Sequence, residues 1–227
     1  MNHSATQIHL ENRSMSAVTS RTDGHLHDIV SFHGENLLMR EFTHRVANDW
    51  SSAISAVSLA ARRSVDPQVK SALGVVVDRL YRQAQLFRAL QMPQSEATID
   101  ATEYLERLCL AISESKLDWM NIRLVLAADP LAMKADNCWR VGMIVLELVT
   151  NAARHAFRGR NDGTIRVDLR CAGQRVECRI TDNGSAAKTI RLGNGLAIVK
   201  ELATSLGGTI EHQFGQRGST SILQFAA

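Results

Sequence analysis

The 227-residue sequence is poor in aromatic residues and proline, and it contains no long uninterrupted apolar run. Aromatic residues make up 5% of it and the formal net charge is only +3, which disfavours a nucleic-acid-binding protein. A membrane-spanning helix needs about 20 predominantly apolar residues. The longest candidate, residues 141–149, contains Glu147, and Met1–Met15 carry no signal-peptide core. These absences predict a cytoplasmic protein with no membrane span.

The cysteines also exclude some chemistry. Cys109, Cys138, Cys171 and Cys178 form no Cys-x-x-Cys pair and match no zinc-binding spacing. This pattern favours four reduced thiols with a structural role. Cys171 and Cys178 could instead face each other across a hairpin, which would leave a redox role open.

The N-terminal part of the chain reads as an arm followed by a helical hairpin. Residues 1–33 are polar and irregular, which predicts a flexible arm. Apolar residues at helical spacing predict one helix over residues 38–61 and a second over residues 67–90. Asp66 suits the N-cap of the second helix, and Pro67 suits its first turn. We assign residues 34–93 to this hairpin.

Each predicted helix of the hairpin carries an apolar stripe. A single hairpin cannot easily bury both stripes by itself, so the natural completion is a homodimeric four-helix bundle. The sequence therefore predicts a dimerisation domain ahead of a second, different domain.

Residues 97–227 alternate between helical and strand-like patterns. The segments 164–169 and 176–180 alternate apolar and polar residues around Ala172-Gly173-Gln174, which predicts a hairpin. The whole pattern predicts an α+β sandwich, an antiparallel sheet with helices on one face. Helices are expected over 101–115, 136–157 and 195–206, and further strands over 98–100, over 122–126 and on either side of 215–218.

His44 is a candidate nucleophile on the first predicted helix. It lies opposite the apolar stripe and therefore faces water, where a phosphate-accepting imidazole must be. Glu41 precedes it by three residues and Asn48 follows it by four, so all three share one face. A carboxylate there can take the proton of one ring nitrogen and leave the other nucleophilic. The alternative is an ordinary solvated surface histidine.

A second constellation lies on the helix expected over residues 136–157. Glu147 and Asn151 are four residues apart, and Arg154 and His155 follow one turn later, so we expect all four to face one groove. The amide oxygen of Asn151 suits Mg²⁺, which prefers oxygen ligands. Arg154 can neutralise phosphate charge, and Glu147 can position a water molecule or complete the metal shell.

Two glycine-containing turns follow in order. Asp182 comes after a predicted strand and can accept a hydrogen bond from an adenine amino group, and Gly184 lets the backbone approach the base. Gly193 and Gly195 open a turn before a helix, whose first amides can meet phosphate. Either turn alone is common in proteins without nucleotides. Their order and spacing after Asn151 predict a magnesium–nucleotide site.

These motifs resemble those of bacterial sensor histidine kinases. Residues 147–157 are similar to the N box of this family, with Arg154 in place of a lysine, and residues 37–48 are similar to the phosphoacceptor box of its HisKA_2-type subfamily. Asp182-Asn-Gly184 resembles the first glycine box, Gly193-Asn-Gly195-Leu196 the second, and Gly218-Ser219-Thr220 the final Gly-Thr element.

The resemblance spans residues 37–226 and carries several implications. It implies a dimeric hairpin domain followed by a Bergerat-type (GHKL) ATP-binding domain that uses ATP and Mg²⁺. It also implies autophosphorylation of His44 and transfer to an aspartate of a response-regulator receiver domain. Leu196 and the Ser219-Thr220 pair then join the nucleotide-binding residues. The in-out pattern of Leu223 and Phe225 favours Ser219 over Thr220 as the counterpart of the family's threonine.

The chain departs from the family pattern at some positions. Ala186 stands at the second glycine of the first glycine box, and the lid between Gly184 and Gly193 is short. These departures keep open a non-enzymatic phosphorelay protein with a degenerate ATP domain. A third interpretation is an ATP-binding regulatory switch. The N-terminal arm is too short for a sensor domain, so input is expected from an upstream sensor protein or from the arm itself.

Overall fold

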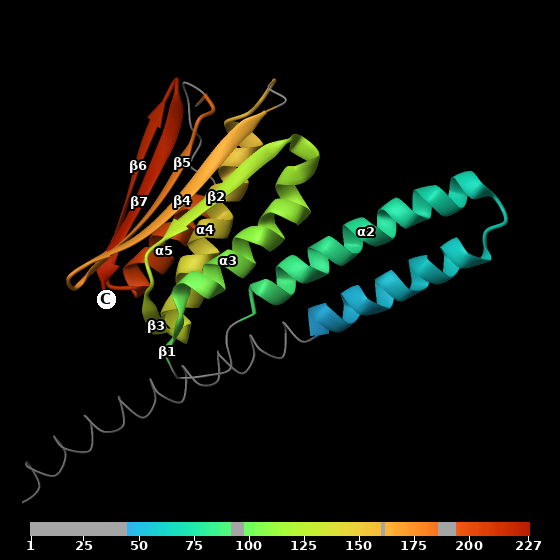
Figure 1. The fold of residues 1–227 in the computed structure, drawn as a ribbon, viewed down its shortest axis with the longest axis horizontal. Coiled ribbons are helices and arrows are strands. Elements are labelled where there is room, and N and C mark those ends of the chain that lie inside the picture. The colour runs from blue at the N-terminus through green and yellow to red at the C-terminus, as the bar shows by residue number, and fades with distance from the viewer. Residues whose placement is uncertain (1–44, 92–97, 160–161, 186–193) are drawn as a thin grey trace, which may run out of the picture. The chain divides into compact units, whose positions relative to one another are not determined.

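The computed structural model describes residues 45–91, 98–159, 162–185 and 194–227. Figure 1 shows these residues as a coloured ribbon. The chain divides into two units after Val46, and nearly all of the described residues belong to the second unit, Ala47–Ala227. The expected N-terminal arm and the expected domain boundary near residues 93–97 fall outside the described residues, so the domain limits remain a prediction.

The hairpin is present in the second unit. Residues 45–63 are helical, and α2 (Pro67–Ala89) follows after a three-residue turn. The N-cap prediction is confirmed, because Asp66 Oδ1 accepts a hydrogen bond of 2.8 Å from the Gln68 amide and Pro67 is the first helical residue. Residues 47–63 run beside α2 in the opposite direction (Figure 1). Apolar side chains such as Leu59, Val69 and Val76 remain exposed.

A five-stranded sheet forms the C-terminal half, in the order β2-β4-β5-β7-β6. Neighbouring strands pair antiparallel except β2 and β4, which are parallel. The expectation of a purely antiparallel sheet is therefore wrong at this pair. Helix α4 lies between β2 and β4 in the chain. A connection through a helix allows the second strand to run in the same direction as the first. The strands are β2 (Ile122–Ala128), β4 (Gly163–Ala172), β5 (Arg175–Asp182), β6 (Thr209–Gly215) and β7 (Gly218–Ala226).

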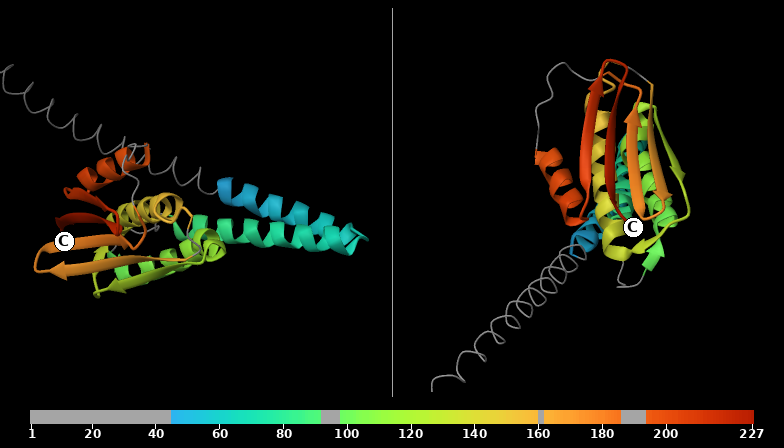
Figure 2. Two further views of the ribbon diagram at one scale, coloured as in Figure 1. Left: turned by 90° about the horizontal axis from the view of Figure 1, so that it is seen from above. Right: turned by 90° about the vertical axis from the view of Figure 1, so that its left-hand side faces the viewer.

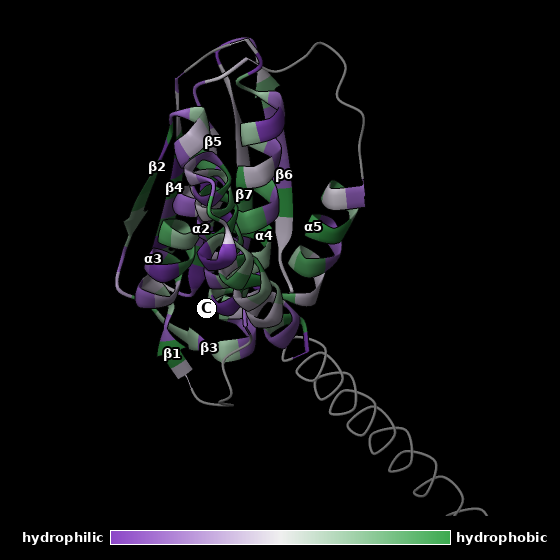
Figure 3. Cartoon of the chain, turned by 90° about the vertical axis from the view of Figure 1, so that its right-hand side faces the viewer, coloured by the Kyte–Doolittle hydropathy of each residue, from purple (hydrophilic) through white to green (hydrophobic). Residues whose placement is uncertain are grey.

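Helices cover one face of this sheet, so the structure is the α+β sandwich that the sequence predicts. They are α3 (Ala101–Ile112), α4 (Ala135–His155) and α5 (Asn194–Ser205). In the right-hand view of Figure 2, α3 and α4 lie behind the strands and α5 lies at the side of them. Figure 3 shows that α4 and α5 carry both apolar and polar residues. Their apolar side chains pack on inward-facing residues of the strands. The core includes Leu108, Ile112, Ile144, Val145, Val149, Ile165, Val167, Val199 and Leu223.

The opposite face of the sheet is polar. Arg166 pairs with Asp168 on β4 at 2.8 Å, and Arg179 pairs with Glu177 on β5 at 2.8 Å. Gln224 of β7 donates to the second oxygen of Glu177 at 2.9 Å. Alternation of core-facing and water-facing residues is expected of strands that are covered by helices on one side only.

Short elements around α3 are only partly predictable from the sequence. β1 (Thr98–Asp100) pairs with β3 (Ala132–Lys134), a strand too short to show a periodic pattern. The helix expected over residues 101–115 leaves the α-helical path after Ile112. It continues as a π-helical turn, η1 (Ser113–Leu117), and a 3₁₀ turn, η2 (Asp118–Met120).

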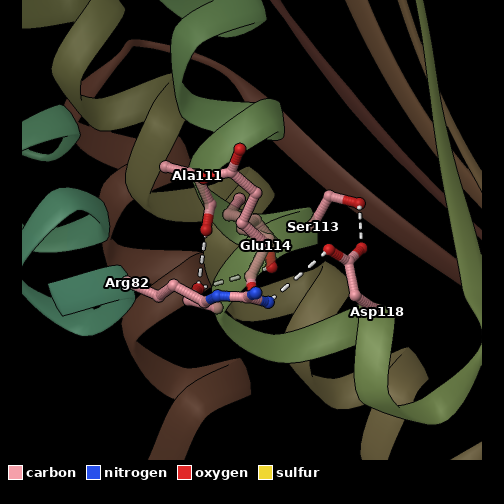
Figure 4. A network of polar contacts seen from close by, with 7 residues as sticks. Arg82, Ala111, Ser113, Glu114 and Asp118 are labelled. Carbon is pink, nitrogen blue, oxygen red and sulfur yellow. Dashed lines mark hydrogen bonds and ion pairs between the residues drawn. The ribbon is translucent and has the colours of Figure 1, made fainter. Parts of the chain in front are cut away.

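Helix α2 contacts this irregular segment through Arg82 (Figure 4). Arg82 Nη1 donates to the Glu114 carbonyl oxygen at 3.1 Å and lies 3.9 Å from the Asp118 carboxylate. Ser113 Oγ donates to the same Asp118 side chain at 3.1 Å. Farther along α2, Leu86 is buried in the core of the sandwich. The last turns of the hairpin are therefore packed on the C-terminal domain.

The cysteines are free thiols, as the sequence favours. The alternative of a facing pair is wrong, because Cys171 is in register with Val176 while Cys178 is opposite Leu169. Burial raises the pKa of the Cys109, Cys138 and Cys178 thiols to about 12, so these three stay protonated at neutral pH. None of the described helices is long and apolar enough to cross a bilayer.

At Gly142, α4 approaches α3 closely, which gives a stability prediction. A Cβ at this position would lie 2.6 Å from Tyr104 Oη and 2.8 Å from Cε1. We expect Gly142→Ala to lower the free energy of unfolding by about 1–3 kcal/mol, since overpacking outweighs the helix propensity of alanine. Gly74→Ala in α2 is the control, because a Cβ there would meet no atom of the described residues within 4 Å. If urea unfolding gave Gly142→Ala and Gly74→Ala the same free energy of unfolding, that result would contradict this packing.

Candidate functional site

Glu147 and Asn151 lie side by side on α4. The apolar residues Ile144, Val145, Leu148 and Val149 turn toward the core, which brings Glu147 and Asn151 to a half-buried edge of the helix. Asn151 Nδ2 donates a hydrogen bond of 3.1 Å to Glu147 Oε1. This contact uses the amide nitrogen and turns the amide oxygen away from Glu147, as a ligand of a hard cation requires.

Arg154 and His155 are exposed in the last turn of α4. Arg158 follows closely, with its Nη2 atom 3.4 Å from His155 Nδ1. Partial burial, together with the charges of Arg158 and Arg154, lowers the pKa of His155. The lowered pKa favours the neutral imidazole, so the arginines carry the positive charge at this end of α4. Such a cluster suits an anionic ligand such as phosphate.

Asp182 is the last residue of β5 and begins a tight turn. Its Oδ1 atom accepts a hydrogen bond of 2.9 Å from the Gly184 amide. Gly184 is buried, and a Cβ there would overlap the Ala156 carbonyl oxygen, which also accepts a 2.8 Å hydrogen bond from the Ser185 amide. The turn is thus packed on the end of α4. This close packing is a reason for glycine that the sequence does not reveal.

The start of β7 lies against the same aspartate. Gly218 has φ +127°, a conformation that favours glycine, and a Cβ there would overlap the Asp182 carbonyl oxygen. Thr220 is in register with Thr181, the residue before Asp182. Ser219 is on the same face of β7 as the buried residues Leu223 and Phe225. The structure therefore brings the Gly-Ser-Thr segment next to Asp182.

The first turn of α5 lies against the middle of α4. A Cβ at Gly195 would overlap the Glu147 carboxylate, so the two helices approach closely at this point. Leu196 is half-buried and packs against the core. Gly193, Ala186 and the rest of the expected lid lie outside the described residues. The described part of the site therefore joins α4, the end of β5, the start of α5 and the start of β7.

The other expected site residues are Glu41, His44 and Asn48, which the sequence assigns to the hairpin. Asn48 is exposed on the helix over residues 45–63. Glu41 and His44 lie outside the described residues, so the position of the imidazole remains a prediction from the sequence.

One residue of the site is not identified by the sequence patterns. Asn183 reads as a spacer between Asp182 and Gly184, but its Oδ1 atom accepts a hydrogen bond of 2.8 Å from the Thr164 amide of β4. No local sequence signal indicates this contact, because Thr164 is 19 residues away in the chain.

Comparisons with known proteins place both parts of the chain in one kind of protein. Residues 41–116 match a family model described as histidine kinase, and residues 120–220 match one described as histidine kinase-like ATPase domain. The sensor histidine kinase PdtaS of Mycolicibacterium smegmatis is 26% identical in an alignment of 194 residues that covers 82% of this chain and 38% of that relative. The chain thus spans little more than a third of the length of this relative.

Two solved structures share the fold. The histidine kinase domain of the Erythrobacter litoralis EL346 blue-light activated histidine kinase has a TM-score of 0.56 at 20% identity, over 78% of this chain and 95% of that one. A structure described as a bacterial phosphotransferase also has a TM-score of 0.56, at 12% identity, over 84% of this chain and 94% of that one.

Proposed function

Because this chain belongs to the histidine kinase family, we propose that it is a cytoplasmic kinase that phosphorylates its own His44 from Mg-ATP. The phosphoryl group then passes to an aspartate of a response-regulator receiver domain, as in two-component signalling. The C-terminal sandwich, residues 97–227, holds the nucleotide, and the hairpin, residues 34–93, carries the histidine.

One observation carries the nucleotide part of this proposal. Segments far apart in the sequence meet around α4: Asn151 is bonded to Glu147, Gly195 abuts Glu147, and the Asp182 turn rests on Ala156. This arrangement provides an amide oxygen for a cation, a carboxylate for a base edge, and a helix N-terminus for phosphate. A structural role alone does not require these three features together.

The donor set around Asn151 fits magnesium, since amide and carboxylate oxygens are its usual protein ligands. When bound, the cation neutralises charge on the phosphates. In the proposed roles, Asn151 supplies an oxygen ligand, Glu147 orients Asn151 or a water molecule, and Asp182 accepts a hydrogen bond from the adenine amino group. Arg154 and His155 line the phosphate side, and Ser219 or Thr220 supports Asp182.

His44 attacks the γ-phosphorus in this proposal. A nitrogen–phosphorus bond forms while the bond from phosphorus to the ADP oxygen breaks, in line with the attack. Glu41 takes the proton from the other ring nitrogen, which keeps the attacking nitrogen nucleophilic. Asn48, one turn farther on, shares this face and helps to hold the imidazole or the phosphoryl group.

The hairpin supports a homodimer. Leu59, Val69 and Val76 remain exposed in a single chain, with 48%, 45% and 44% of their surface accessible. Packing two hairpins into a four-helix bundle would remove such side chains from water. We place the response regulator and an upstream sensor protein among the partners on the strength of the family alone.

A non-enzymatic phosphorelay protein is the second candidate. Ala186 and the short spacing between Gly184 and Gly193 favour it, since both depart from the sequence pattern of the family's first glycine box and lid. Incubation of the wild-type protein with γ-labelled ATP and magnesium separates the two. A kinase acquires an acid-labile label from ATP directly, whereas a relay protein acquires it only from a phosphorylated receiver domain. Tight ATP binding without any label on the protein would favour a regulatory switch instead.

Gly195→Ala tests the contact between α5 and α4. The added methyl group overlaps the Glu147 carboxylate and must displace either that side chain or the first turn of α5. We expect calorimetry to show Mg-ATP affinity weakened about tenfold, the equivalent of a modest overpacking cost. Gly74→Ala, the same change in open surroundings, should bind like the wild type. Equal affinity for the two variants would show that the approach of Gly195 to Glu147 does not shape the site.

A further inference from the structure

The pairing of β4 with β5 ends in an unusual way beside Asp182. Regular antiparallel pairing extends from Ala172 and Arg175 to Ile165 and Asp182. The next pair joins Thr164 and Asn183, and half of it is ordinary, since the Asn183 amide donates to the Thr164 carbonyl oxygen at 3.2 Å. The other half is not ordinary. The Thr164 amide donates to the side-chain Oδ1 of Asn183 at 2.8 Å, where a regular ladder would use the main-chain carbonyl of Asn183.

The side-chain amide of Asn183 therefore replaces a backbone acceptor. This substitution satisfies the strand while it releases the Asn183 carbonyl from the ladder, so the chain can turn at once. Two hydrogen bonds then hold the turn. The Gly184 amide donates to Asp182 Oδ1 at 2.9 Å, and the Ser185 amide donates to the Ala156 carbonyl oxygen at 2.8 Å.

These contacts fix the direction of the Asp182 carboxylate. One oxygen, Oδ1, is engaged by the Gly184 amide, and the Asp182 carbonyl abuts Gly218. Within the part of the chain that the structure describes, the second oxygen, Oδ2, has no hydrogen-bond donor. The half-buried carboxylate thus keeps one oriented acceptor for a ligand.

We infer that Asn183 is a positioning residue for base selection: by ending the β4–β5 ladder with its side chain, it aims Asp182 at the 6-amino group of adenine. The inference rests on the proposed function, because it needs a nucleotide in this site. Alanine at position 183 would remove the acceptor, so the turn could rejoin the ladder through the main chain and rotate Asp182. Aspartate would keep an acceptor oxygen in the same place.

The experiment compares Mg-ATP with Mg-inosine triphosphate, which carries an oxo group where adenine carries its amino group. Calorimetry gives both dissociation constants for the wild-type protein, Asn183→Ala and Asn183→Asp. We expect the alanine variant to bind ATP about tenfold more weakly, the usual cost of one lost hydrogen bond, with little change for inosine triphosphate. The aspartate variant should keep the wild-type preference for ATP.

Asn183 is exposed, so the Thr164 amide can turn to water in the alanine variant and the fold should persist. If that variant fails to fold, Asn183→Ser replaces it in the experiment. We expect the same loss of ATP affinity, since the serine hydroxyl is one bond too short to replace Oδ1. The inference is overturned if the alanine or serine variant keeps the wild-type preference for ATP over inosine triphosphate. It is also overturned if that variant binds both nucleotides more weakly by the same factor. A wild-type protein that does not bind Mg-ATP overturns the proposed function itself, so the two failures are distinguishable.

Discussion

His44→Ala should abolish labelling of the protein by γ-labelled ATP while leaving Mg-ATP binding unchanged. The imidazole is the proposed acceptor, and alanine has no nucleophile, so the loss of label should be complete rather than partial. The proposed nucleotide-binding residues that the structure describes lie in the C-terminal sandwich, so removal of the His44 side chain should not alter them. Autoradiography measures the label, and calorimetry measures the dissociation constant.

His33→Ala is the matched control for this experiment. It removes a histidine from the same N-terminal part of the chain, and it should label like the wild-type protein. Undiminished label on His44→Ala would show that another residue accepts the phosphoryl group. Unlabelled wild-type protein that accepts phosphate from a phosphorylated receiver domain would favour the phosphorelay alternative.

Asn151→Ala should weaken Mg-ATP binding by about 10- to 100-fold and reduce labelling accordingly. The change removes the amide oxygen proposed as a cation ligand. It also removes the Nδ2 donor of the 3.1 Å hydrogen bond to Glu147, so a half-buried carboxylate loses its partner. Titration calorimetry in the presence and absence of magnesium would separate these effects, because loss of a cation ligand should weaken magnesium-dependent binding most.

Asn137→Ala is a suitable control for the Asn151 variant. Asn137 is on the same helix, and its Oδ1 atom accepts a hydrogen bond of 3.2 Å from Arg140, about four turns from Asn151. Its loss should leave nucleotide affinity within experimental error. If both variants bind Mg-ATP like the wild type, the nucleotide lies elsewhere and the assignment of Asn151 to the nucleotide site is wrong.

Sequence reasoning succeeds where the signal is local. Asp66 followed by Pro67 marks the start of α2, and both take the expected positions. The apolar stripe of α4 places Glu147 and Asn151 on one side of the helix, where they form a hydrogen bond. Alternating residues reveal β4 and β5, because a strand covered on one face alone repeats every two residues.

Features that depend on distant contacts are not predictable in the same way. The parallel pairing of β2 with β4 follows from the path of the chain through α4 and leaves no mark within either strand. The packing of Gly184 on Ala156 depends on two separate elements meeting. The facing pair considered for Cys171 and Cys178 is wrong because of the length of the turn. Ala172 and Arg175 form the last pair, and the turn contains only Gly173 and Gln174, so Cys171 is opposite Val176.

The polar outer face of the sheet has a consequence for how copies of this protein can meet. Stacking two such faces would bury the ion pairs Arg166–Asp168 and Glu177–Arg179, and withdrawing paired charges from water costs several kcal/mol per ion before their attraction is regained. Face-to-face aggregation of sheets is therefore disfavoured. In the proposed homodimer, the exposed apolar residues of the hairpin would meet instead, and the ion pairs of the sheet would stay in water.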